Sequence, residues 1–259
     1  MIAILKDVFK RKDLLKYLVI THLKLSYANK VLGYFWSLLD PLAMMAVYLI
    51  LVTIIFERKE PQFPILVFSS LLAWQWFTFS LSDSVNSLSK KSKIILSIKF
   101  PLAILPISIV LKYLCRYLLG LLVLIPMLLL FRAHITFSVL WFPVIVFIQG
   151  FFTIGLCLIS AILGVYFQDM NNIIQFIIRI WFYGSPILYS IKDSISEKYQ
   201  TILFMLNPFA AIFTSYKSIF VWGMSPTKYL WISFIISVIC FISGLALFSM
   251  YEHKIPKDL

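Results

Sequence analysis

Residues 140–165 read LWFPVIVFIQGFFTIGLCLISAILGV, a stretch without a single Asp, Glu, Lys or Arg. A hydrocarbon core about 30 Å thick needs roughly 20 apolar residues of helix, so this stretch is long enough to cross a bilayer. Comparable apolar stretches lie on both sides of it, at 33–56, 63–83, 104–130, 172–190 and 229–251. We therefore predict an all-α integral membrane protein with six transmembrane helices.

The composition excludes several classes of protein. Hydrophobic residues make up 61% of the 259 residues, and the mean hydropathy of +0.95 is far too high for a soluble domain. The net charge is +12 although only 13% of residues are charged, and in a membrane protein such an excess marks cytoplasmic segments, so we exclude a nucleic-acid partner. Cys115, Cys157 and Cys240 lack metal-ligand spacing and the three histidines are scattered, so no metal site or catalytic cluster is predicted.

The distribution of basic residues predicts the orientation. They are concentrated in residues 1–30 and in the connection at 89–100, with Lys254 and Lys257 near the C-terminal end. Six spans place these three regions on the same side of the membrane. The positive-inside rule then predicts a multi-pass protein with both termini in the cytoplasm.

Residues 1–32 precede the first span and have an amphipathic pattern. Over residues 2–30, apolar side chains recur at helical spacing, and lysines occupy most of the opposite face. We expect an amphipathic helix in the cytoplasmic interface, followed by a six-span domain over 33–259. The amphipathic helix either takes part in function or serves only as a passive anchor.

The apolar run at about 199–222 is interrupted by Asn207-Pro208. Proline removes a backbone donor and disfavours helix in the residue before it, so the run divides into two pieces that are too short to span. We expect two short external re-entrant helices between the fifth and sixth spans.

Six short motifs, in order along the chain, resemble those of the ABC-2-type polysaccharide exporter permeases. They are LGYFWSLLDP at 32–41, WQWF at 74–77, KFP at 99–101 with a further proline at 106, FQD at 167–169, SPILY at 185–189 and NPF at 207–209. The chain looks most like the permeases that export O-antigen polysaccharides, with teichoic acid and capsule exporter permeases close to them. It departs from the family at Ser26 and Gln168, where members often have Arg. Each departure removes a planar guanidinium group.

This resemblance implies a partner that supplies the energy. The chain has no GxxxxGK[ST] sequence, so no ATP site of the ordinary kind and no catalytic site are predicted in it. The family resemblance implies a homodimer with two copies of a separate ATP-binding subunit that holds ATP and Mg²⁺. It also implies export of an undecaprenyl-diphosphate-linked glycan across the bacterial inner membrane. The basic segment Ser89 to Phe100 is the candidate for coupling to the ATPase; the alternative is an ordinary solvated loop. The coupling candidates are Lys90, Lys91, Lys93, Lys99, Gln168 and Asp169.

Lys112 and Arg116 are intramembrane charges one helical turn apart. They are expected either to form a cationic patch along the path of an anionic or pyrophosphate-bearing substrate, or to snorkel or pair with Asp83. Aromatic rings that could stack on sugar faces, or else sit in the membrane interface, complete the substrate-path candidates: Trp36, Tyr48, Trp74, Trp76 and Phe79. The candidates for a cytoplasmic entrance or gate are Lys24, Tyr27, Lys30 and Asp40.

Two other function classes remain as alternatives. An ion-coupled secondary transporter usually has repeated halves and a broken helix near the bilayer midplane, whereas here no repeat is visible and the break lies outside. A membrane-embedded transferase needs a cluster of carboxylates or histidines, and none is visible in the sequence.

Overall fold

The computed structural model describes residues 2–27, 35–50, 62–98, 100–131, 133–134, 136–191 and 196–258, and every regular element in these ranges is a helix. The bundle is built from α4 (Phe63–Val85), α6 (Ile104–Leu130), α7 (Phe142–Tyr166) and α12 (Leu230–Tyr251). Each is long and apolar enough to cross a membrane, α7 together with the short η4 (Phe137–Trp141) before it. The all-helical fold is thus confirmed, and these four helices start or end within a few residues of the predicted spans.

The first and fifth predicted spans are represented by shorter helices. α3 (Trp36–Ile50) runs through Asp40 and Pro41, while the rest of the span predicted at 33–56 lies mostly outside the described residues. α8 (Met170–Tyr183) has 14 residues, about 21 Å of helix, and the chain then turns through the SPILY motif. Six spans therefore stay a prediction.

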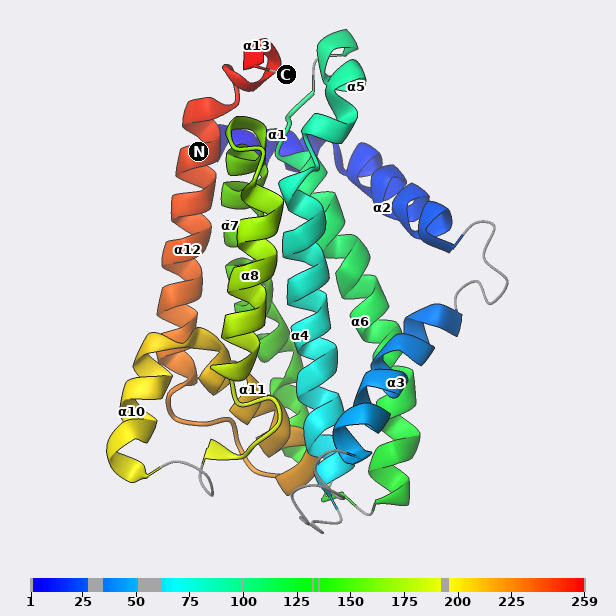
Figure 1. The fold of residues 1–259 in the computed structure, drawn as a ribbon, viewed down its shortest axis with the longest axis vertical. Helices are drawn as coiled ribbons and strands as arrows, with labels where there is room; N and C mark the ends of the chain where they lie inside the picture. Colours follow the sequence, from blue (N-terminus) through cyan, green and yellow to red (C-terminus); the bar gives the residue numbers. More distant parts are fainter. Residues whose placement is uncertain are drawn as a thin grey trace.

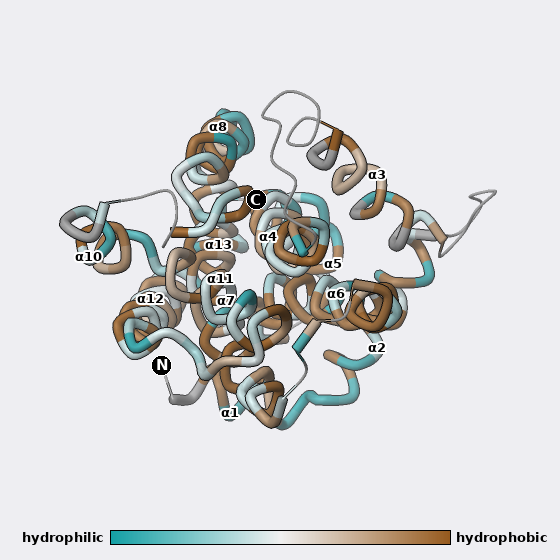
Figure 2. The backbone as a smooth tube through the Cα atoms, turned by 90° about the horizontal axis from the view of Figure 1, so that it is seen from below, coloured by the Kyte–Doolittle hydropathy of each residue, from teal (hydrophilic) through white to brown (hydrophobic). Residues whose placement is uncertain are grey.

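α4 is the central helix of the bundle. It contacts α3, α6, α7, α8 and α11 (Pro208–Lys217), as Figures 1 and 2 show from two directions. A cluster of aromatic rings packs between α4, α8 and α11, with the ring centroids of Phe77 and Phe209 4.6 Å apart and Trp181 edge-on to both. α7 and α12 approach closely where Gly155 faces Gly244. Glycine permits this approach, because a Cβ atom at either position would collide with the backbone of the other helix.

The N-terminal segment expected as one helix is two helices, α1 (Ile2–Lys10) and α2 (Lys12–Tyr27), which meet at Arg11. Ile4 and Val8 of α1 are buried in a hydrophobic cluster that also includes Leu245 and Phe248 of α12. α2 instead crosses α6 and slopes away from the bundle (Figure 1). The turn at Arg11 lets each helix follow a different neighbour. Part of the apolar face therefore packs on protein.

The two ends of the bundle differ in charge. One end, called the basic end below, gathers α1, α2, η3 (Ser89–Lys91), α5 (Ser92–Ser97) and α13 (Ile255–Asp258), with both chain ends nearby (Figure 1). The opposite end holds α10 (Glu197–Leu206), α11 and the π-helical turn η5 (Ser218–Trp222). The three basic regions thus lie at one end, as expected. Which end faces the cytoplasm stays a prediction.

Candidate functional site

One face of α4 is polar at the depth of the apolar spans. Between Ile65 and Val85 every residue is buried except Gln75, Thr78, Phe79, Ser82 and Asp83. These five residues recur at positions i, i+3, i+4, i+7 and i+8, so they lie on one face of the helix. We call them the polar stripe. Apart from Phe79, its members are hydrogen-bonding or charged side chains on the central helix of an apolar bundle.

α8 extends this polar surface on one side. Asn171, Gln175 and Arg179 recur every four residues, and the Gln175 Nε2 atom donates to Ser82 Oγ over 2.7 Å. Arg179 is exposed. Because α8 and α4 run in opposite directions, Arg179 and Thr78 both lie one turn beyond the Gln175–Ser82 contact, toward the end opposite the basic end (Figure 1).

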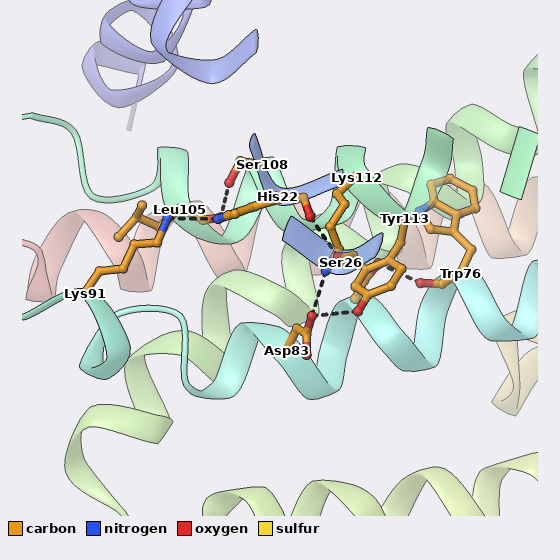
Figure 3. Close-up of polar contacts among 10 residues, drawn as sticks. His22, Ser26, Trp76, Asp83, Lys91, Leu105, Ser108, Lys112 and Tyr113 are labelled. Carbon is orange, nitrogen blue, oxygen red and sulfur yellow. Dashed lines mark hydrogen bonds and ion pairs between the residues drawn. The ribbon is translucent and has the colours of Figure 1, made fainter. Parts of the chain in front are cut away.

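Two ion pairs border the polar stripe from α6 (Figure 3 shows the first). Lys112 Nζ lies 2.9 Å from Asp83 Oδ2, and the Tyr113 hydroxyl donates to the same oxygen over 2.6 Å. The side chain of Lys112 is 10% exposed and that of Asp83 is 45% exposed. Lys112 is therefore paired with Asp83, which was one of the outcomes expected from the sequence.

The second pair joins α6 to α3. Arg116 Nη2 lies 2.6 Å from Asp40 Oδ2, and the guanidinium group sits over the Phe79 ring with 4.9 Å to its centroid. The Arg116 side chain is 18% exposed and that of Asp40 is 43% exposed. In both pairs the carboxylate is the more open member.

A cavity of about 280 Å³ lies beside the polar stripe, toward the basic end, between α2, α4, η3 and α6. We call it the vestibule. Its lining residues are His22, Leu25, Ser26, Asp83, Ser87, Lys90, Lys91, Leu105, Ile109 and Lys112. Three of these residues are lysines and one is an aspartate, so the vestibule attracts anions.

A hydrogen bond across the vestibule joins the N-terminal segment to the connection between α4 and α6. Lys91 Nζ lies 2.9 Å from His22 Nε2 (Figure 3). An ammonium group only donates, so Nε2 accepts and a neutral His22 carries its proton on Nδ1. Burial, followed by the charge of Lys91, lowers the pKa of His22 to about 4. Burial also lowers the pKa of Lys91. The ring therefore stays neutral near pH 7.

The other entrance and coupling candidates lie around the basic end. Lys24 is exposed on α2, Lys90 on η3 and Lys93 on α5. Gln168 and Asp169 are exposed in the turn between α7 and α8. Tyr27 ends α2, but its side chain, like Lys30 and Lys99, lies outside the described residues. The Ser26 hydroxyl donates to the His22 carbonyl over 2.7 Å.

The predicted aromatic candidates divide into core and surface residues. Trp74 and Trp76 are buried in the bundle, where Trp76 Nε1 donates to the Val110 carbonyl over 3.1 Å. Phe79 belongs to the polar stripe. Trp36 is exposed at the beginning of α3, and Tyr48 lies in α3 with its side chain outside the described residues.

Sequence reasoning missed the hydrogen-bonding members of the polar stripe. It searched the spans for ionisable and aromatic side chains and passed over Gln75, Thr78 and Ser82. Their helical spacing within the second span was the available signal. Among the residues that the structure describes, no three of His, Cys, Asp or Glu come together in a way that could hold a metal ion.

At the opposite end, the SPILY and NPF motifs meet. Asn207 Oδ1 accepts from Trp181 Nε1 over 3.1 Å and from the Phe209 amide over 3.0 Å. Its Nδ2 donates to the Gly184 carbonyl over 3.0 Å and to Ser185 Oγ over 2.9 Å. These bonds cap α11 and attach it to the end of α8. The break at Asn207-Pro208 is confirmed, with a bend of 107° between the two flanking helices.

Lys217 at the end of α11 strengthens this attachment. Its buried ammonium group donates to the carbonyls of Pro186, Ile187 and Tyr189 over 2.6, 3.2 and 2.8 Å. All ten residues of α11 are buried, whereas Ile202, Met205 and Leu206 of α10 are exposed. α11 is thus a fixed element at this end, and α10 is its exposed neighbour.

Comparison of the sequence with known proteins shows which proteins this chain is similar to. Residues 13–221 match the family model described as ABC-2 type transporter. The O-antigen export system permease protein RfbA of Myxococcus xanthus is 32% identical over 220 residues, 85% of each chain. Two proteins of the same name from Klebsiella pneumoniae are 30% and 28% identical over 248 residues, 95% of each chain.

Proposed function

Because this chain belongs to the ABC-2 type transporter family, we propose that it is the membrane permease of an ATP-driven exporter that moves a lipid-linked polysaccharide of O-antigen type out of the cytoplasm. The names of its relatives support the substrate class. The polar stripe is the structural observation that carries the proposal.

A polar surface at membrane depth needs an aqueous or protein environment. Polar and ionisable groups facing hydrocarbon are costly, and they normally face a bundle interior or a water-filled cavity. The polar stripe and Arg179 lie on the open side of α4 and α8 in a single chain. A second copy that presents the same face would enclose an aqueous path, which supports a homodimer with the stripe as the lining.

The vestibule is suited to the anionic part of a lipid carrier. Lys90, Lys91 and Lys112 converge on it, and α2 separates it from the surrounding interface. An undecaprenyl-diphosphate headgroup would place its two phosphates among these ammonium groups while its hydrocarbon tail stays in the bilayer. The glycan attached to the headgroup would then lie next to Ser82 and Asp83.

The exposed residues at the basic end suit a docking surface for the motor. Lys90, Lys93, Gln168 and Asp169 are available to two copies of an ATP-binding subunit, which would hold ATP and Mg²⁺. A displacement of η3 and α5 on that subunit would reach α2 through the Lys91–His22 hydrogen bond. The positive-inside rule then puts the basic end and both termini in the cytoplasm, in a bacterial inner membrane.

The remaining parts of the proposal concern topology. Residues 1–32 form the interface segment and 33–259 form the permease domain, with α3 and α8 belonging to the first and fifth of six spans. α10 and α11 are the external re-entrant helices at 199–222. The anchoring of α11 by Asn207 and Lys217 supports a rigid external end in which α10 is the element free to move.

Cysteine accessibility tests whether the polar stripe lines an aqueous path. Thr78→Cys and Ser82→Cys, in a background without Cys115, Cys157 and Cys240, should react in membrane vesicles with a water-soluble maleimide. Leu122→Cys, an exposed apolar position on α6, is the lipid-facing control and should not react. If both stripe cysteines stay unreactive with and without the ATPase and ATP, the stripe is not a translocation path.

A further inference from the structure

The vestibule and the polar stripe differ in charge, although they are continuous at Asp83. The vestibule has three lysines around one aspartate. Beyond Asp83, the hydrogen-bonding groups of the stripe are the amide of Gln75 and the hydroxyls of Thr78 and Ser82. The lysine cluster of the vestibule therefore ends where the stripe begins.

The charges that border the stripe nearly cancel. Asp83 is paired with Lys112, and Asp40 is paired with Arg116. In each pair the carboxylate is exposed by more than 40% and the cation by less than 20%, so the open surface presents the acids. Arg179 adds one exposed cation, with no ion-pair partner among the residues that the structure describes. Counted over the described residues, the two ion pairs cancel, and Arg179 leaves these five groups with a net charge of +1.

This balance is informative because pores for anions use another lining. Anion and phosphate pathways are built with rings of Arg or Lys. A polymer with a charge on every repeat would meet the exposed carboxylates of Asp83 and Asp40 and find one unpaired cation. Amide and hydroxyl groups, in contrast, both donate and accept, so they can exchange hydrogen bonds with successive sugar hydroxyls as a chain slides.

We infer that the polymer carried along the polar stripe is an uncharged polysaccharide, and that the negative charge of the substrate is confined to the lipid-diphosphate group held in the vestibule. This inference rests on the proposed function. It distinguishes a neutral glycan from a phosphate-rich polymer such as a teichoic acid.

The experiment measures the electrostatic potential at the stripe with two thiol reagents of similar size and opposite charge. The ethylammonium and ethylsulfonate methanethiosulfonates are applied to the complex with its ATPase, carrying Thr78→Cys or Ser82→Cys. Each rate is divided by the rate of the same reagent with a small thiol in solution. One uncompensated unit charge about 8 Å away in a water-like medium changes the ratio of the two rates about fivefold.

For a neutral path, the corrected rates of the two reagents should agree within about twofold at both positions. A preference of about fivefold or more for the anionic reagent would overturn the inference, because it would show a path built for anions. Failure of both reagents at both cysteines would instead overturn the proposed function, since the stripe would then be dry.

Two variants test the sensitivity of the measurement. Asp40→Asn combined with Asp83→Asn removes both exposed acids and should shift the rates toward the anionic reagent by fivefold or more. Arg179→Gln leaves both ion pairs intact and is the alternative if the first variant does not fold. It should shift the rates at Thr78→Cys toward the cationic reagent. If the variant that folds causes no shift, these charges do not face the path, and the inference is wrong.

Discussion

The Lys112–Asp83 ion pair offers a quantitative test of the site because its two members differ in exposure. Lys112→Met leaves a carboxylate that is 45% exposed and still accepts from Tyr113. Asp83→Asn leaves an ammonium group whose side chain is only 10% exposed. Water can hydrate the unpaired carboxylate of Asp83 far better than the unpaired ammonium group of Lys112. We therefore expect Asp83→Asn to be the more destabilising change.

The magnitudes follow from this asymmetry. Exposed ion pairs contribute about 0–1 kcal/mol, and removal of one partner from a buried pair costs about 3–5 kcal/mol. With one member buried and one half-exposed, Asp83→Asn should cost about 2–3 kcal/mol and Lys112→Met about 1 kcal/mol. The double variant should cost less than the sum by about 1 kcal/mol, because neither charge is then left alone.

Unfolding of the purified permease in detergent, followed by tryptophan fluorescence across a denaturant series, measures the four proteins of this cycle. Tyr113→Phe is the matched control, since it removes one hydrogen bond to Asp83 Oδ2 and leaves the ion pair intact. It should cost about 1–2 kcal/mol. Equal losses for Asp83→Asn and Lys112→Met, or a strictly additive double variant, would refute the argument from exposure.

Four further outcomes are expected. Lys93→Glu, at an exposed position, should reduce co-purification with the ATPase, whereas Lys91→Gln should retain the complex but weaken export, because Lys91 faces His22; normal export by both variants would leave the segment a plain loop. The His22 ring stays neutral when folded, so stability should fall as pH decreases from about 6.5, its ordinary pKa, to about 4, while the unfolded chain takes up the proton; His22→Gln should flatten this slope, and an unchanged slope would contradict it. Asn207→Ala removes four hydrogen bonds and should cost about 2–4 kcal/mol in the same unfolding assay, with Asn172→Ala, exposed on α8, as a near-neutral control. The purified permease alone should not hydrolyse ATP, and turnover by a homogeneous sample would contradict the assignment of the motor to a partner.

Local chemistry in the sequence was sufficient to predict the helical fold, the bounds of most long helices and the break before α11. Apolar length determines which segments can cross a bilayer, and this property does not depend on the rest of the chain. The break at Asn207-Pro208 was predictable for a similar reason, since proline restricts its own backbone and that of the preceding residue. The six ordered motifs were likewise sufficient for the family, because each is a local pattern.

Only the tertiary structure decided which side chains meet. Asp83 and Lys112 are 29 residues apart, and Asp40 and Arg116 are 76 apart, so their pairing depends on how α3, α4 and α6 are rotated against each other. The same rotations bury Trp74 and Trp76 and leave the polar stripe open. The N-terminal segment divides at Arg11, where α1 joins a hydrophobic cluster at the basic end and α2 crosses α6. Helical periodicity shows that residues share a face, but only packing determines whether that face meets lipid, protein or an aqueous path.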